Sequence, residues 1–190
     1  MNVFACCIHP ARVAVQKATG VEPLCCPPVT AESFDPLWLE GHDLLYFRLH
    51  GFQDRHDVWY GEHPDMKKTV PAALWAASIQ HYPALAAKTV ERADVSGSIV
   101  VIANCYGADN PVFAGAFYTS GAIAVIAAPG TNFAAGSDVI GADSLVKTLI
   151  DNLQRGMDTR KALAWAKTNL LFTAWRAADR DALGFRIVEV

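Results

Sequence analysis

Two residues able to perform nucleophilic chemistry follow apolar segments of strand length. His50 comes directly after residues 44–49, Cys105 comes directly after residues 99–104, and a glycine follows each within two residues. A thiol is mostly protonated at neutral pH, so a cysteine nucleophile needs a base nearby to take its proton. Histidine titrates near neutrality and can later return that proton to a leaving amine. The pattern indicates a Cys/His pair suited to acyl transfer.

The residues beside this pair supply further candidates for the site. A residue without Cβ lets backbone amides turn toward a substrate carbonyl, so the N–H groups of Gly51 and Cys105 are predicted to bind an oxyanion. Asp54, His56 and Asp57 lie close to His50 in sequence and are candidates to orient its imidazole. A hydrated loop would contain the same residues, and the sequence leaves both interpretations open.

The elements that must position the pair alternate between strands and helices. Open α/β sheets place their ligands where strands leave the sheet, which is where His50 and Cys105 are expected. Residues 1–41 are the least regular part because of their prolines. Strands are predicted at 3–8, 44–49, 99–104, 122–127 and 185–190, helices at 71–79, 83–91, 112–118, 142–155 and 159–172, and loops at 53–65 and 131–138. This order predicts an α/β fold with a mainly parallel sheet between helical layers.

Length and composition predict one globular domain over residues 1–190, in which 1–41 form an N-terminal extension. The chain has 190 residues, 52% of them hydrophobic and 18% charged, and a formal net charge of −3. No cluster of Lys and Arg suggests a nucleic-acid surface. Neither a basic stretch followed by an apolar segment nor an apolar run of membrane length is present. A soluble, cytoplasmic protein without nucleic-acid or membrane partners is therefore expected.

The other cysteines do not form a recognisable disulfide framework. They occur as the vicinal pairs Cys6-Cys7 and Cys25-Cys26, which with Cys105 make an odd number. Free thiols that serve as small buried side chains are the favoured interpretation. A zinc site built from the two pairs and His9 is the alternative, although zinc ligands are normally spaced by two or more residues. No metal and no cofactor is predicted.

The order of these motifs resembles a known superfamily. Strand-His-Gly followed by strand-x-Cys-x-Gly is similar to the caspase-like cysteine peptidases, which include caspases, gingipains and separase. The separation of 55 residues is close to the roughly 50 residues between the two catalytic residues of caspases. Residues 117–126, 149–156 and 162–166 resemble bacterial CHAT domains in particular. The resemblance covers residues 43–190.

The resemblance implies a three-layer α/β/α caspase-like fold, with His50 and Cys105 as the dyad and Gly51 as the second oxyanion donor. In that superfamily the residue two before the cysteine helps line the pocket for the P1 side chain. Here it is Ala103, which cannot select a charge, and Asn104 is expected beside it. Asp138, in the loop 131–138, is the candidate for binding a basic P1 residue, and a helix N-cap or a solvated loop aspartate is its other interpretation.

These observations predict a cysteine endopeptidase, a hydrolase that acts on a peptide or protein substrate through the Cys/His dyad. A regulatory protein partner that orders the loops 53–65 and 131–138 is a further expectation. The alternative is a catalytically inactive caspase-like domain that serves as a protein-binding or assembly module.

Overall fold

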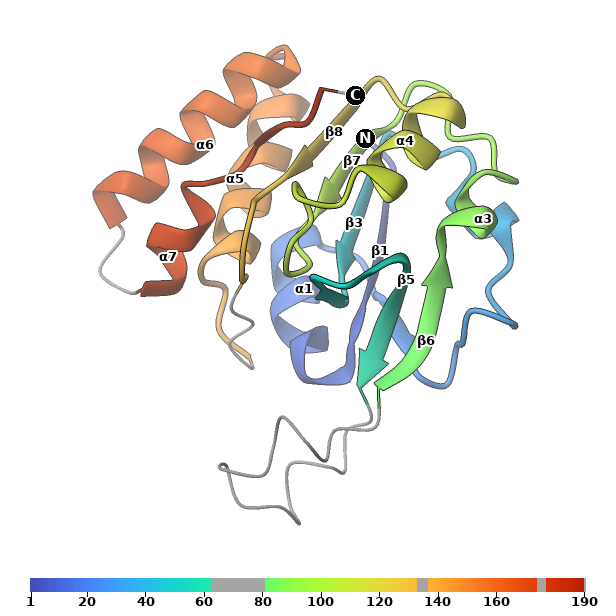
Figure 1. The fold of residues 1–190 in the computed structure, drawn as a ribbon. Helices are drawn as coiled ribbons and strands as arrows, with labels where there is room; N and C mark the ends of the chain where they lie inside the picture. Colours follow the sequence, from blue (N-terminus) through green and yellow to red (C-terminus); the bar gives the residue numbers. More distant parts are fainter. Residues whose placement is uncertain (63–80, 133–136, 174–176, 190) are drawn as a thin grey trace, which may run out of the picture.

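A computed structural model describes residues 1–62, 81–132, 137–173 and 177–189. Within them, six strands form a central sheet in the order β2-β1-β3-β7-β8-β9 (Figure 1). The strands are β1 (Val3–Ile8), β2 (Leu24–Cys26), β3 (Leu44–Arg48), β7 (Ile99–Ile102), β8 (Ala124–Ala127) and β9 (Arg186–Ile187). All neighbours pair in parallel except β8 and β9, which are antiparallel. The predicted α/β class with a mainly parallel sheet is confirmed.

Helices cover both faces of this sheet. One face carries α1 (Arg12–Thr19), α5 (Ala142–Gln154), α6 (Thr159–Thr173) and α7 (Ala177–Ala182), and the other carries α3 (Ala87–Val90) and α4 (Pro111–Thr119) (Figure 1). The 3₁₀ turns η1 (His9–Ala11) and η2 (Pro36–Leu39) lie in the connections. Successive side chains along β3 point to opposite faces of the sheet, so the strand contacts both helical layers. Tyr46 contacts α5, and its neighbour Phe47 packs on Phe117 of α4. The architecture is compatible with three α/β/α layers.

A second, three-stranded antiparallel sheet extends the layer that contains α4. Its strands are β4 (His50–Phe52), β5 (Arg55–Glu62) and β6 (His81–Ala86), in that order. Trp59 of β5 is buried and stacks on Phe113 of α4, with ring centroids 3.6 Å apart. The prediction of a loop at 53–65 is therefore wrong for residues 55–62; residues 53–54 form the turn between β4 and β5, and 63–65 lie outside the described residues. The first residues of β5 are polar and exposed, so their composition is typical of a loop and does not indicate a strand. The second half of β5 is largely buried and contains strand-forming residues.

Most other predicted elements are present with shifted ends. The strand at 3–8 and the helices at 112–118, 142–155 and 159–172 are confirmed to within one residue. The strands predicted at 122–127 and 185–190 are shorter, and the helix predicted at 83–91 keeps only α3, because its first part belongs to β6. Helix α1 in the segment 12–19 was not predicted. The helix predicted at 71–79 lies outside the described residues.

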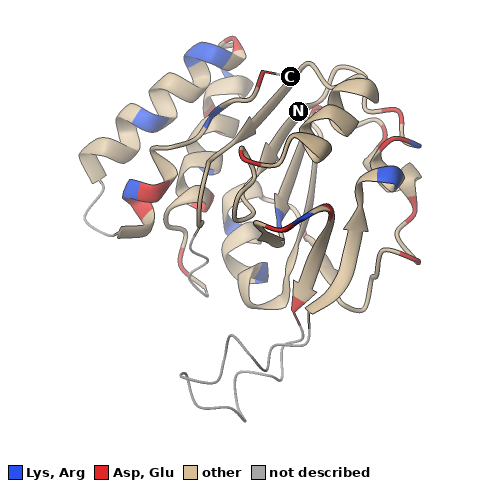
Figure 2. Cartoon of the chain, in the orientation of Figure 1, with Lys and Arg blue, Asp and Glu red and all other residues tan. Residues whose placement is uncertain are grey.

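Charged residues occur mainly on the helices and connecting segments, and the strands of the central sheet contain few of them (Figure 2). Residues 44–47 of β3 and 100–102 of β7 have no exposed surface. Arg48, at the end of β3, is also buried. A charge buried at this depth needs a partner, so the contacts of Arg48 indicate which segments it holds together. In the part of the chain that the structure describes, no helix combines the length and the apolar character needed to cross a membrane.

Candidate functional site

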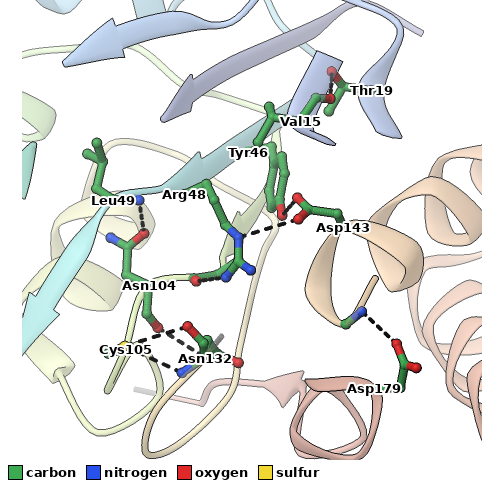
Figure 3. Close-up of polar contacts among 12 residues, drawn as sticks. Val15, Thr19, Tyr46, Arg48, Leu49, Asn104, Cys105, Asn132, Asp143 and Asp179 are labelled. Atoms are coloured by element: carbon green, nitrogen blue, oxygen red, sulfur yellow. Dashed lines mark hydrogen bonds and ion pairs between the residues drawn. The ribbon is translucent and has the colours of Figure 1, made fainter. Parts of the chain in front are cut away.

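Contacts continue between the chain segments that leave the carboxyl ends of β3 and β7, after the last residues that pair in the sheet. Arg48 donates from Nη1 to the carbonyl oxygen of Ala103 at 2.8 Å, and the backbone N–H of Leu49 donates to Oδ1 of Asn104 at 2.7 Å (Figure 3). Both contacts are buried. They hold the segment leading into His50 against the segment leading into Cys105.

Gly51 makes the next contact of this series. A Cβ added to Gly51 would lie 2.1 Å from the carbonyl oxygen of Cys105 and 3.6 Å from Cβ of Asn104. Only a residue without a side chain allows the two backbones to come this close. The structure thus brings together the His50-Gly51 and Asn104-Cys105 segments, which are far apart in sequence.

The Cys105 thiol is half-buried and lies against the segment after β8. The backbone N–H of Asn132 is 3.4 Å from Sγ, and the thiol can donate to the carbonyl oxygen of Asn132 at 3.7 Å (Figure 3). The Asn132 side chain donates from Nδ2 to the carbonyl oxygen of Asn104 at 3.0 Å. These contacts hold the Cys105 sulfur against the backbone of Asn132.

The turn after the cysteine holds this arrangement in place. Tyr106 has a φ of 58°, in the left-handed region that non-glycine residues rarely adopt. Its N–H donates to the carbonyl oxygen of Gly130, and the Asp109 carboxylate accepts from the N–H of Gly130 at 2.8 Å. The loops after β7 and β8 are therefore bonded to one another on both sides of Cys105. Strain of this kind, in a backbone held by its surroundings, is typical of functional sites.

His50 is held by a buried carboxylate that the sequence did not single out. Nε2 of His50 lies 2.9 Å from Oε2 of Glu62, across the β4–β5 hairpin. The Glu62 side chain is 2% exposed and that of His50 is 25% exposed. Among the described residues, Oε1 of Glu62 has no hydrogen-bond partner. Because an ionised carboxylate only accepts, the contact places the proton of neutral His50 on Nε2 and leaves Nδ1 free to take another.

A second imidazole packs on the first. The rings of His50 and His81 meet edge to face with centroids 4.9 Å apart, and His81 also packs against Phe52 at 4.8 Å. Burial, together with the charge of His50, lowers the pKa of His81 to about 4. His81 is therefore neutral near pH 7 and adds no charge that competes with the contact between His50 and Glu62.

A buried ionic cluster lies on the face of the central sheet that α5 covers. Nε of Arg48 is 3.6 Å from Oδ2 of Asp143 in the first turn of α5, and the Tyr46 hydroxyl donates to Oδ1 of Asp143 at 2.6 Å (Figure 3). Both members of the ion pair are at most 2% exposed. Burial raises the pKa of Asp143, and the charge of Arg48 opposes that shift. The cluster fixes the guanidinium that holds Ala103.

The predicted site residues fall into three groups. His50, Gly51 and Cys105 lie at one place, the joined ends of β3 and β7. Ala103 and Asn104, predicted to bind substrate, are at most 1% exposed, so they hold neighbouring segments and offer almost no surface.

The other candidates lie at the surface. Asp138 is exposed, and residues 133–136 of its loop lie outside the described residues. Asp54, His56 and Asp57 are exposed and lie in or just before β5. In the structure, the carboxylate that contacts His50 is Glu62 and not one of these residues.

Glu62, Asn132 and Asp143 were missed by the sequence analysis. Glu62 reaches His50 because strands β4 and β5 pair so that His50 lies opposite Tyr60. The sequence feature that could have identified Glu62 is a carboxylate directly after the apolar Trp-Tyr-Gly segment. Asn132 contacts the cysteine through its backbone, which leaves no signal in residue type. Asp143 was hidden in the first turn of a helix, where acidic residues are ordinary.

The zinc interpretation of the N-terminal thiols gains no support from their arrangement. Cys7 pairs with Cys25 in register, whereas Cys6 approaches Cys26 from the other face of the sheet. Within the residues that the structure describes, no group of three or more His, Cys, Asp or Glu side chains is arranged to hold a metal ion.

Comparisons with known proteins give no match: no family model matches the chain, and neither does any curated protein. The geometry of the site carries the functional argument.

Proposed function

We propose that this chain is a cysteine endopeptidase of caspase-like type, with Cys105 as the nucleophile and His50 as the general acid and base. The observation that carries the proposal is the series of contacts that brings the His50 and Cys105 segments together: Arg48 with Ala103, Leu49 with Asn104, and Gly51 with Cys105. A buried carboxylate on the base and an N–H group directed at the sulfur add the electrostatic components that such a dyad needs.

The proposed reaction assigns each group a step. His50 takes the thiol proton on Nδ1 while Cys105 Sγ bonds to the substrate carbonyl carbon, and the oxygen of that carbonyl becomes an oxyanion. The backbone N–H groups of Gly51 and Cys105 are the proposed donors to it. His50 then gives its proton to the leaving amine, the C–N bond breaks, and an acyl-enzyme remains.

Hydrolysis of the acyl-enzyme reverses these roles. His50 removes a proton from water as the water oxygen attacks the thioester carbon, and the proton returns to Cys105 Sγ as the C–S bond breaks. Glu62 holds the imidazole in one orientation throughout and balances the positive charge that His50 acquires. A carboxylate has the same role behind the histidine of serine protease triads.

The test is covalent labelling with a peptidyl electrophile that carries a ketone-type reactive group. Labelling should occur at Cys105, and His50→Ala should slow it by about 100-fold, because general-base assistance contributes roughly that much or more. His56→Ala, which changes an exposed histidine in β5, is the matched control and should label like the wild type.

Labelling at Cys105 that His50→Ala leaves unchanged would overturn the proposed mechanism. Labelling spread over several cysteines would do the same. Either result would favour the inactive binding or assembly module.

A further inference from the structure

Two pairs of thiols lie on opposite faces of the strands β1 and β2. Cys7 and Cys25 are register partners on these neighbouring parallel strands, on the face that α1 covers. Cys6 and Cys26 are on the other face, with their sulfur atoms 3.6 Å apart. Cys6, Cys7 and Cys26 have no exposed surface, whereas Cys25 is partly exposed. Of these four thiols, only Cys25 can meet a reagent from solvent.

Cys25 and Cys7 differ in their ionisation. Interaction with the Cys7 thiol and the positive charge of Arg12 lower the pKa of Cys25, and burial and the charge of Glu22 only partly oppose this shift. Interaction with Cys25, together with burial, raises the pKa of Cys7. Arg12 begins α1 and is ion-paired with Glu22, which shows that the guanidinium lies at this edge of the sheet. Cys25 is therefore the more readily ionised of the two thiols, and Cys7 is the one that more readily keeps its proton.

The strand pairing brings the two residues close enough for a disulfide. Neighbouring strands lie about 4.8 Å apart, and disulfides join residues whose Cα atoms are about 4.4–6.8 Å apart. Residues in register point their side chains to the same face of a sheet, so neither strand has to turn for the sulfur atoms to meet.

We propose that Cys7 and Cys25 form a peroxide-sensitive dithiol site that closes to a disulfide, with Cys25 reacting first. The Cys25 thiolate attacks one oxygen of hydrogen peroxide, an S–O bond forms, and the O–O bond breaks to release hydroxide. Cys7 sulfur then attacks the Cys25 sulfenic acid, the S–S bond forms, and the S–O bond breaks. The departing hydroxyl leaves as water with the Cys7 proton. The hydroxide from the first step takes up the proton that Cys25 lost on ionising, so two thiols are oxidised and one peroxide is reduced to two waters.

This inference does not rest on the proposed function, because none of its groups belongs to the site around Cys105. The experiment treats the reduced full chain with hydrogen peroxide, blocks remaining thiols with iodoacetamide, and maps tryptic peptides by mass spectrometry. The expected product joins the peptides 1–12 and 18–48 and lacks two hydrogens. Fragmentation should place the bond between Cys7 and Cys25. Thioredoxin-type reduction should restore both thiols.

Two serine variants separate this pair from its neighbour on the other face. Cys25→Ser should reduce cross-linking by about tenfold or more, because the thiolate is lost. Cys26→Ser should leave the bond intact. Wild-type fragmentation decides the result if either variant folds poorly.

Three results would overturn the inference: a bond between Cys6 and Cys26, oxidation of Cys25 to sulfenic or sulfinic acid without cross-linking, or a bond from Cys25 to Cys105. Cross-linking that persists in Cys25→Ser would overturn it as well.

Discussion

The contact between Gly51 and the Cys105 backbone gives the sharpest test of the site. In Gly51→Ala, the new Cβ would lie 2.1 Å from the Cys105 carbonyl oxygen, so the two segments must separate by at least about 1.3 Å to reach ordinary contact. Gly51 does not have a left-handed φ, so the effect is steric and not conformational. Overpacking of this kind costs about 1–3 kcal/mol of the free energy of unfolding. Displacement of a reacting group by about 1 Å can slow catalysis about 100-fold.

The assay combines peptidyl-electrophile labelling of Cys105 with urea unfolding. Gly51→Ala should label about 100-fold more slowly while it remains folded in the absence of urea. Gly115→Ala, in α4 with open space around its Cα, should label normally and unfold at slightly higher urea concentration. In Gly121→Ala, just before β8, the new Cβ would clash with Ser96. This variant should unfold at lower urea concentration but should label at Cys105 as fast as the wild type. A folded Gly51→Ala that labels at the wild-type rate would refute the argument.

Three further predictions concern buried charges and rings. Glu62→Gln removes the charge behind His50 and should slow labelling of Cys105 by roughly 100-fold, and unchanged labelling would contradict the assigned role. Asp143→Asn leaves the buried guanidinium without a counter-charge and should cost about 3–5 kcal/mol in urea unfolding, whereas Asp151→Asn, at an exposed pair, should cost under about 0.5 kcal/mol. His81 has a pKa of about 4 in the fold and about 6.5 when unfolded, so the unfolded chain binds the proton first as pH falls. The free energy of unfolding should therefore fall between pH 6.5 and 4 by about 2 kcal/mol after allowance for partial exposure, and His81→Gln should remove that part of the slope.

The strands of the central sheet, and the positions of His50 and Cys105 just after two of them, could be predicted because each depends on local pattern. Continuous apolar segments of four to six residues, ended by reactive residues and glycine, are typical of buried parallel strands. The amphipathic spacing of the helices α5 and α6 is equally local. For such elements the sequence of one segment carries enough of the signal.

The contacts of His50 and Cys105 could not be predicted because they depend on pairing between segments. Glu62 meets His50 only because β5 turns back on β4, and the polar residues that begin β5 have the composition of a loop. The Asn132 contact to Cys105 is made by backbone atoms, which every residue type carries. The short strand β6 was mistaken for helix because Ala and Leu are strong helix formers, and its pairing with β5 outweighs that preference.

The buried ion pair of Arg48 and Asp143 is best explained by the segments that it holds in position, and not by a gain in the stability of the fold. Apolar side chains of similar volume often stabilise a core as well as a buried ion pair does, because removing two charges from water is costly. Arg48 also donates to Ala103, two residues before Cys105, and it lies two residues before His50. An apolar residue there could fill the space but could not attach α5 to the end of β7. Because Glu62 holds His50 from the other face, buried charges constrain this edge of the sheet from both sides. Such constraint is expected where two side chains must be held in one relative position, and packing alone does not require it.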